Sequence, residues 1–370
     1  WQHYLDLFEN LLPGLIEEYN PDIPYWSSSP SNGWGRDKAY KEGDVHYWGV
    51  WWGKEPFELY EEKVGRFMSE YGFQGMPDLK TIHEFTLPED RNMNSVVMNV
   101  HQKNPFGWEA IQEYMLRDYK VPQLFDDYIY VSQLLQARGI RTAIEAHRRA
   151  KPYCMGTLYW QFNDCWPVTS WSGIDYYGRW KAMQYHVKKA YKTYLLSFNK
   201  ERDGIAIYVV SDSIQDAVAS LNWKIIDFDG NILGKGQEEI KIAKNSSAVF
   251  KKIRHNEFKS SKSSVLLFAE LVGKNRSLAS AYYYFEKPKN LELSPVKIQM
   301  KIEEGNNRYV ISLASETLAK SVQLNTDIEG TLSDNYFDLL PHETKKIYFT
   351  TEQPSSQIPK FQIKCLNNIY

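Results

Sequence analysis

The sequence is poor in cysteine. Only Cys154, Cys165 and Cys365 occur among 370 residues, and their spacing fits neither a disulfide framework nor a metal-binding motif. Cys154 and Cys165 flank a segment that reads as a buried strand, so we expect thiols packed in the core. The sequence therefore predicts no metal site and no cofactor.

An excess of one charge and a long apolar run are also missing. Lys and Arg total 44 against 46 Asp and Glu, whereas proteins that bind nucleic acid usually carry a basic excess. No run of 18 apolar residues is present, so we expect no membrane partner. A signal peptide is not visible either, but the chain begins at Trp1 within a helical pattern and without Met. We therefore expect the natural N-terminus to lie upstream.

Aromatic residues, in contrast, are abundant and unevenly placed. They make up 15% of the chain, and of the 12 Trp only Trp223 follows residue 181. Flat aromatic faces suit stacking on sugar rings, although a large core also consumes Trp. A chain of this length is sufficient for two or three domains.

The first part of the sequence alternates between helical and extended patterns. Apolar residues recur at three- and four-residue steps over residues 1–16, which predicts an amphipathic helix with one buried stripe. The predicted strands are residues 23–26, 44–49, 66–71 and 155–160. The predicted helices are residues 58–63, 124–151 and 179–194, with helical turns between 75 and 121. This alternation indicates parallel βα units.

After residue 197 the pattern changes to short strands separated by Gly and Asp turns. The predicted strands are residues 205–210, 221–226, 265–272, 281–285, 296–302, 308–313, 322–325 and 346–350. We interpret them as two β-sandwiches, residues 199–287 and 288–370. Neither contains a motif for chemistry, because the Asn256-Glu257 pair lies in this all-β part and reads as surface.

One carboxylate stands out within the predicted strand that ends at Gly72. Glu70 follows Phe67 and Met68, and a charge in such a setting is costly to bury unless it is paired or takes part in chemistry. A structural explanation would be an ion pair with Arg66 or Lys63. From the pattern alone the two explanations remain open.

Five segments of the first part resemble the catalytic barrel of glycoside hydrolase family 2, and in particular its β-mannosidases. They are Ser28–Gly33, Gly43–Trp48, Arg66–Gln74, Gly156–Asp164 and Ile174–Lys181, in that order. The resemblance implies an α/β plus all-β chain. Residues 1–198 would form the C-terminal half of a TIM (β/α)8 barrel, followed by two immunoglobulin-like β-sandwich domains at 199–287 and 288–370.

The resemblance also implies a role for Glu70. In this family the Glu of the Ser-Glu-Tyr-Gly segment is the nucleophile at the end of a barrel strand, and such barrels carry their catalytic residues at strand ends. The family's acid/base Glu would lie upstream of Trp1. Four strands cannot close an eight-stranded barrel. We therefore expect a fragment that is inactive alone and whose partner is the missing N-terminal half of the same enzyme.

Three tryptophans are candidates for sugar binding by the same resemblance. Trp160 would form the floor of the sugar site, Trp34 an aromatic wall, and Trp48 would line it, although core packing explains each of them as well. We expect Asp164 and Arg179 to form a buried pair or to support the site. His46 reads as a hydrogen-bonded histidine of the core or rim rather than a catalytic residue.

The predicted function is exo-hydrolysis of terminal non-reducing β-D-mannose with retention, on a β-mannoside oligosaccharide or glycoconjugate. The alternatives are another family 2 activity, on β-galactosides, β-glucuronides or β-glucosaminides, and a non-catalytic carbohydrate-binding or structural module. A homodimer is left open. The low cysteine content and a tail rich in Lys, Ile, Asn and Tyr favour a bacterial protein that is periplasmic or secreted.

Overall fold

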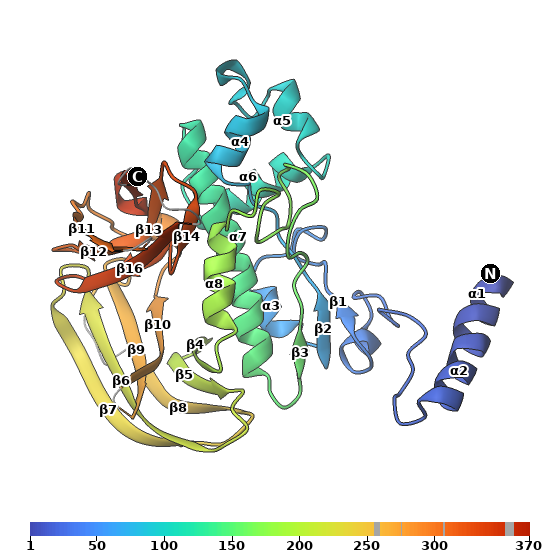
Figure 1. The fold of residues 1–370 in the computed structure, drawn as a ribbon. Helices are drawn as coiled ribbons and strands as arrows, with labels where there is room; N and C mark the ends of the chain where they lie inside the picture. The colour runs from blue at the N-terminus through green and yellow to red at the C-terminus, as the bar shows by residue number, and fades with distance from the viewer. Residues whose placement is uncertain (255–259, 275, 306–307, 352–358) are drawn as a thin grey trace. The chain divides into compact units, whose positions relative to one another are not determined.

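The computed structural model describes residues 1–254, 260–274, 276–305, 308–351 and 359–370 (Figure 1). The chain packs as two compact units, Trp1–Phe73 with Thr142–Gln161, and Gln74–Arg141 with Phe162–Tyr370. The predicted barrel segment, residues 1–198, is thus divided between both units. Asn256-Glu257, predicted to be a surface pair, lies outside the described residues.

A three-stranded parallel sheet organises the first unit, with β2 between β1 and β3 (Figure 1). Its strands are β1 (Val45–His46), β2 (Phe67–Glu70) and β3 (Gly156–Thr157). Val45 and Met68 pair across β1 and β2 and are fully buried. Burial of their side chains is what holds such short strands together, since two to four residues supply few ladder hydrogen bonds.

Helical segments surround these strands in the first unit. They are α1 (Gln2–Leu5), η1 (Asp6–Leu11), α2 (Leu12–Tyr19), η2 (Asp37–Tyr40) and α3 (Leu59–Glu62). The predicted N-terminal helix is confirmed, but its stripe is not buried. Of its members, Trp1, Leu11 and Leu15 are 85%, 54% and 40% exposed. The strand predicted at 23–26 is wrong, because these residues form no strand; Pro24 lacks the amide hydrogen that a sheet ladder needs.

Between residues 75 and 121, where the sequence indicated helical turns, the second unit contains α4 (Leu79–Phe85), η3 (Pro88–Asp90), α5 (Val96–Val100) and α6 (Gly107–Asp118). The helices predicted at 124–151 and 179–194 are confirmed as α7 (Phe125–Arg149) and α8 (Ala182–Ala190). Helix α7 continues into the first unit. The buried Lys181 donates to the carbonyls of Gly75 (3.0 Å) and Ser170 (3.2 Å). No helix in the described ranges is long and apolar enough to cross a membrane.

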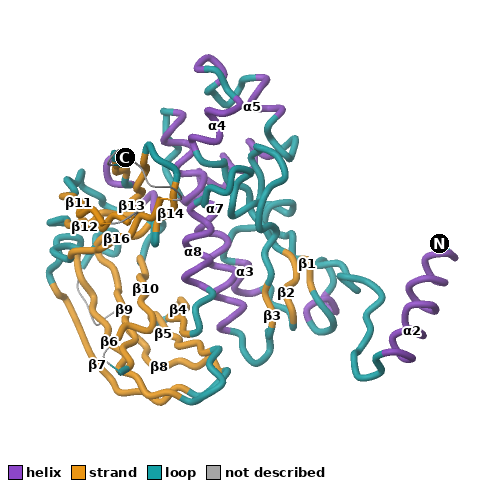
Figure 2. Tube along the Cα trace, in the orientation of Figure 1, coloured by secondary structure: helices purple, strands orange, loops and turns teal. Residues whose placement is uncertain are grey.

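Strands dominate the chain from Tyr194 onward (Figure 2). The first group is β4 (Tyr194–Glu201), β5 (Gly204–Ser211), β6 (Ala217–Asp227), β7 (Ile232–Ile242), β8 (Ser246–Arg254), β9 (Val265–Gly273) and β10 (Arg276–Tyr284). They form two sheets, β10-β9-β6-β7 and β4-β5-β8. Side chains from both sheets share one core, in which Ile207 of β5 and Leu221 of β6 are fully buried. This is a β-sandwich, as the alternating sequence predicted.

A second group of strands follows a short connection. It contains η5 (Pro288–Asn290), β11 (Gln299–Gly305), β12 (Arg308–Ala314), β13 (Ala319–Thr326), β14 (Gly330–Leu332), β15 (Phe337–Leu339), β16 (Thr344–Thr351), β17 (Phe361–Lys364) and η6 (Leu366–Asn368). The sheets are β11-β12-β16-β14 and β15-β13-β17. Strand β12 alternates buried and half-buried residues, which is the pattern of a strand with one face on a core.

Candidate active site

The ends of the three parallel strands place polar side chains together in the first unit. His46 on β1 pairs in register with Glu70 on β2, and the amide of Tyr47 donates to the carbonyl of Glu70 at 2.8 Å. After β3, the amide of Trp160 donates to the carbonyl of Tyr71 at 2.8 Å. Because the carboxyl ends of parallel strands meet at one edge of a sheet, residues just past these ends share that edge.

Glu70 is held there by a tryptophan and a histidine rather than by a lysine or an arginine. Its Oε2 accepts a hydrogen bond from the indole Nε1 of Trp48 at 3.2 Å and lies 3.3 Å from Nδ1 of His46. The side chain keeps 25% of its surface exposed. Arg66 and Lys63, the cations that could have explained Glu70 structurally, lie over the rings of Tyr153 and Tyr40.

Behind Glu70, His46 is joined to a second carboxylate. Its Nε2 lies 3.2 Å from the hydroxyl oxygen of Ser29 and 3.7 Å from Oδ2 of Asp44. Asp44 accepts hydrogen bonds from the hydroxyls of Ser29, at 2.5 Å, and of Ser69. The ring of His46 therefore has an oxygen atom close to each of its two nitrogens, so its orientation is fixed from both sides.

This geometry orients the carboxylate of Glu70 without a contact to a lysine or an arginine in the part of the chain that the structure describes. Trp48 and His46 both approach Oε2, and a carboxylate offers about four lone-pair sites on its two oxygens. A partly exposed carboxylate with one oxygen fixed by donors is arranged to attack an electrophilic carbon or to accept a substrate hydroxyl. Asp44 lies near Nε2 of His46, on the side of the ring away from Glu70, and contacts Glu70 only through that ring.

A buried hydrogen-bonded chain supports the sheet beneath the site. The hydroxyl of Tyr71 lies 2.7 Å from that of Thr157, which lies 2.8 Å from Nδ1 of His147 on α7. Burial, with the charge of Arg149 nearby, lowers the pKa of His147 to about 3. His147 is consequently neutral at ordinary pH, and its Nε2 has no hydrogen-bond partner among the residues that the structure describes.

The three candidate tryptophans have different surroundings. Trp48 is half-buried and donates directly to Glu70. Trp160 is 44% exposed and follows β3 at the shared edge. The ring of Trp34 packs edge-on against the buried Tyr47, with 6.1 Å between ring centroids. Trp34 is half-buried, like Trp48. Sugar binding by Trp34, Trp48 and Trp160 stays a prediction.

The predicted Asp164–Arg179 pair is replaced by contacts with other residues. Asp164 is buried and accepts from the hydroxyls of Ser170 (2.7 Å) and Ser172 (2.5 Å). Arg179 instead binds Glu329 at 2.9 Å, on the loop before β14. The sequence offered a buried pair only as one explanation of these two residues, beside sugar contact, and the partners of side chains in different loops are set by the fold.

Sequence reasoning missed Asp44 and Ser29 and did not connect His46 with Glu70. The sequence did contain a pattern that relates Asp44 to His46. Asp44, His46 and Trp48 are spaced by two residues, and side chains at that spacing point to the same face of a strand. Their register against Glu70 could not be read from the sequence. The described part of the chain contains no group of three or more His, Cys, Asp or Glu residues placed to hold a metal ion.

Family comparisons agree with the two β-sandwiches. Residues 203–290 match a family model described as a mannosidase Ig/CBM-like domain, and residues 293–369 match one described as an Ig-fold domain. The first match covers strands β5 to β10, and the second covers β11 to β17.

Relatives identified by sequence are β-mannosidases. β-Mannosidase B of Aspergillus flavus is 32% identical over 203 residues, which is 53% of this chain and 24% of that protein. β-Mannosidase B of Emericella nidulans is 29% identical over 241 residues, 60% of this chain and 28% of that protein. The matched regions therefore span about a quarter of the length of these relatives.

Solved structures extend the similarity over nearly the whole chain. The β-D-mannosidase of Dictyoglomus thermophilum has a TM-score of 0.89 and 30% identity, covering 98% of this chain and 45% of that one. The exo-chitosanase CsxA of Amycolatopsis orientalis has a TM-score of 0.71 with 14% identity, over 89% of this chain and 45% of that one, and so shares the fold. The chain is similar in sequence and in fold to a C-terminal part of the β-mannosidases of glycoside hydrolase family 2.

Proposed function

We propose that this chain is part of a retaining exo-β-mannosidase in which Glu70 is the nucleophile. The observation that carries the proposal is the carboxylate of Glu70 at the end of the central parallel strand, oriented by Trp48 at 3.2 Å and by His46 at 3.3 Å. The relatives named as β-mannosidases supply the substrate class. The three parallel strands β1, β2 and β3, with the helices between them in sequence, support the proposal that residues 1–198 are part of a (β/α)8 barrel.

In the proposed first step, an oxygen of Glu70 attacks the anomeric carbon of a terminal β-mannoside. The bond from that carbon to the leaving oxygen breaks, and a carboxylic acid donates a proton to this oxygen. In the second step the same acid, now a base, takes a proton from water. The water oxygen bonds to the anomeric carbon, and Glu70 leaves as a carboxylate.

The acid/base residue of this scheme is proposed to come from a segment upstream of Trp1. A retaining enzyme needs its two carboxyl groups about 5–5.5 Å apart. Asp44, the carboxylate described next to the site, is separated from Glu70 by the His46 ring. We therefore propose that the 370-residue chain acts together with the N-terminal half of the same enzyme and is inactive alone.

Hydrolysis of a chromogenic aryl β-D-mannoside tests the proposal. We expect no turnover by the 370-residue chain. A longer polypeptide that includes the upstream barrel strands should turn the substrate over, and Glu70→Gln should abolish this activity. Glu62→Gln, at an exposed carboxylate of the same unit, is the matched control and should retain activity. A 2-deoxy-2-fluoro-β-mannosyl fluoride should label Glu70 in the longer polypeptide, and peptide mass mapping would identify the labelled residue.

Three results would contradict the proposal. Activity of the longer polypeptide that survives Glu70→Gln would remove Glu70 from the mechanism. A higher kcat/KM on an aryl β-galactoside, β-glucuronide or β-glucosaminide than on the mannoside would favour another family 2 activity. Complete lack of turnover on all four glycosides, with no labelling, would support a non-catalytic module.

A further inference from the structure

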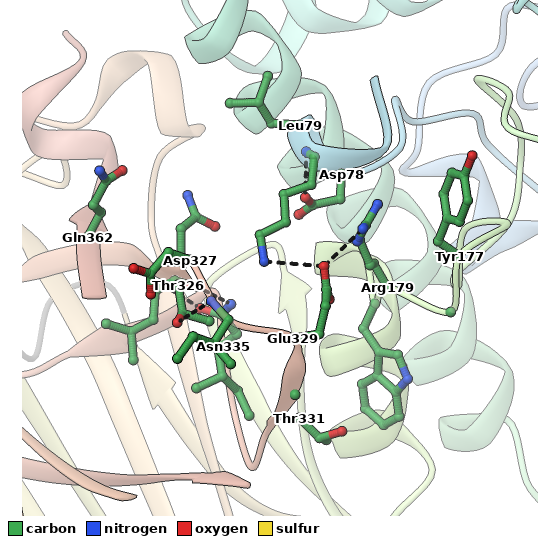
Figure 3. Close-up of a pocket in the computed structure, with 18 of the residues that line it drawn as sticks. Asp78, Leu79, Tyr177, Arg179, Thr326, Asp327, Glu329, Thr331, Asn335 and Gln362 are labelled. Atoms are coloured by element: carbon green, nitrogen blue, oxygen red, sulfur yellow. Dashed lines mark hydrogen bonds and ion pairs between the residues drawn. The ribbon is translucent and has the colours of Figure 1, made fainter. Parts of the chain in front are cut away.

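A cavity of about 380 Å³ lies in the second unit, built from parts of the chain that the proposed reaction does not use (Figure 3). Its walls are the start of α4, the loop that leads into α8, and the connection between β13 and β14 of the last sandwich. Glu70, Trp48 and Trp160 are not among its lining residues. The volume falls within the range of about 300–1,000 Å³ that small-molecule pockets occupy.

The charged side chains that line the cavity are balanced in number. The basic residues are Lys80, Arg179 and Lys360, and the acidic residues are Asp78, Asp327 and Glu329. A site for phosphate or a dicarboxylate would need an excess of positive charge, and a site for an amine an excess of negative charge. The cavity therefore favours a ligand without net charge.

One carboxylate in the cavity is fixed in place while it stays accessible. Glu329 lies 3.5 Å from Nζ of Lys80 and 2.9 Å from Nη2 of Arg179, and its side chain is 60% exposed (Figure 3). Nη1 of Arg179 is itself anchored by a hydrogen bond to the hydroxyl of Thr81 at 2.9 Å. Burial opposes ionisation of Glu329, but the hydrogen bond from Arg179 and the charge of Lys80 outweigh it and lower the pKa of Glu329.

Neutral polar groups and aromatic faces complete the lining. Asn325, Thr326, Thr331 and Gln362 contribute amides and hydroxyls, which can both donate and accept hydrogen bonds. Tyr177, at the edge of the cavity, is 46% exposed, and the guanidinium of Arg179 lies 5.1 Å from its ring centroid. Tyr176 lies edge-on to this ring with 5.0 Å between ring centroids. The accessible part of an aromatic ring can pack against the C–H face of a saccharide, whose hydroxyls need the polar partners.

We propose that this cavity is a non-catalytic binding site for a neutral saccharide of one or two sugar rings. Glu329 accepts hydrogen bonds from vicinal hydroxyls, the neutral side chains bind the remaining ones, and Tyr177 contacts the apolar face of a ring. The proposal goes beyond the proposed function, with which it shares only the class of ligand. The site would hold a saccharide on this polypeptide without cleaving it.

The test measures binding of β-1,4-mannobiose, and of cellobiose for comparison, to the 370-residue chain by isothermal titration calorimetry. The chain carries Glu70→Gln, so that hydrolysis cannot interfere. Thr331→Trp places a bulky ring in the cavity from an exposed position and should abolish binding. Glu329→Gln should weaken it about tenfold, as expected for loss of a hydrogen bond to a charged group. Circular dichroism and Tm verify that each variant folds.

A matched control shows whether a loss of binding is specific to the cavity, and four outcomes would contradict the proposal. Thr344→Trp is the same change at an exposed threonine of β16 outside the cavity, and it should leave binding unchanged. The proposal is overturned by absence of binding at millimolar saccharide, by binding that Thr331→Trp does not affect, or by tighter binding of inorganic phosphate than of either saccharide. Binding that is lost in Trp160→Ala but kept in Thr331→Trp would place the saccharide at the Glu70 site. It would overturn the proposal of a second site and leave the proposed function intact.

Discussion

At the scale of single residues, the candidate site depends on which atoms approach Glu70. Donors from Trp48 and His46 both meet Oε2. Asp44 in turn faces His46 and binds two serine hydroxyls. Such a chain holds a side chain in one rotamer without a close cation, and a reacting group gains from being held near its productive geometry.

Trp48→Phe isolates one contact of this arrangement. The ring is kept and the Nε1 donor to Glu70 is lost. A hydrogen bond to a charged group contributes about 1.5–3 kcal/mol, so kcat/KM on an aryl β-mannoside should fall at least about tenfold in the enzyme that contains this chain. Trp52→Phe, at a 55% exposed indole of the same unit, should leave kcat/KM within about twofold. Equal effects of the two substitutions would show that the contact with Glu70 has no role.

At the scale of elements, the short strands of the first unit are stabilised by side-chain contacts with neighbouring elements. β1 and β3 have two residues each. The side chains of Tyr71, Thr157 and His147 connect the end of β2, the strand β3 and the helix α7 in the first unit. His147 is buried in its neutral form, so this connection depends on pH.

Acid should destabilise the first unit through His147. Its pKa is lowered from 6.5 to about 3 in the folded chain. Below pH 6.5 the unfolded chain binds a proton that the folded chain does not, so this contribution to stability is complete above pH 6.5 and is lost as the pH falls toward 3. At pH 5 the loss is about 2 kcal/mol.

Urea denaturation at pH 7 and pH 5 measures this effect. His147→Gln removes the titrating group, so its stability should fall by about 2 kcal/mol less between the two pH values than that of the unmodified chain. His3→Gln changes an exposed histidine of the same unit and should follow the unmodified chain. An unchanged pH dependence in His147→Gln would show that this histidine does not limit acid stability.

At the scale of the whole chain, the second unit joins helices to the last sandwich by buried polar contacts. The hydroxyl of Tyr336 donates to Gln133 of α7 at 2.9 Å and accepts from Gln323 of β13 at 2.7 Å. The hydroxyl of Tyr130 donates to the carbonyl of Ser321. These contacts explain why helices and sandwich strands form one compact unit rather than separate bodies.

Tyr336→Phe tests the energetic weight of this junction. The substitution leaves buried amide groups of Gln133 and Gln323 without the hydroxyl and should lower the free energy of unfolding by about 1–3 kcal/mol. Tyr348→Phe, at a 36% exposed tyrosine of β16, should change it by less than about 0.5 kcal/mol. Thermal unfolding followed by circular dichroism compares the two, and similar Tm values would argue that the sandwich is not coupled to the helices.

The sequence by itself determined the types of most elements. Sequence patterns predicted the helix at 124–151, observed at Phe125–Arg149, and the strands at 205–210, 265–272 and 308–313, because each pattern reflects local burial along one element. The prediction failed for a strand at 23–26, where Pro24 lacks a ladder donor, and for the burial of the apolar stripe on the N-terminal helix, none of whose residues is fully buried. A sequence pattern shows which face of a helix or strand is apolar, but it does not show which other element packs against that face.

For the site, the resemblance in the sequence singled out Glu70, Trp34, Trp48 and Trp160 as individual residues. Only the tertiary structure decided that Trp48 and His46 both contact Glu70, and that Arg179 and Lys80 both bind Glu329. The physical reason is that hydrogen bonds and ion pairs act over a few ångströms between residues far apart along the chain. Their partners are chosen by strand register and by packing, which no local pattern encodes.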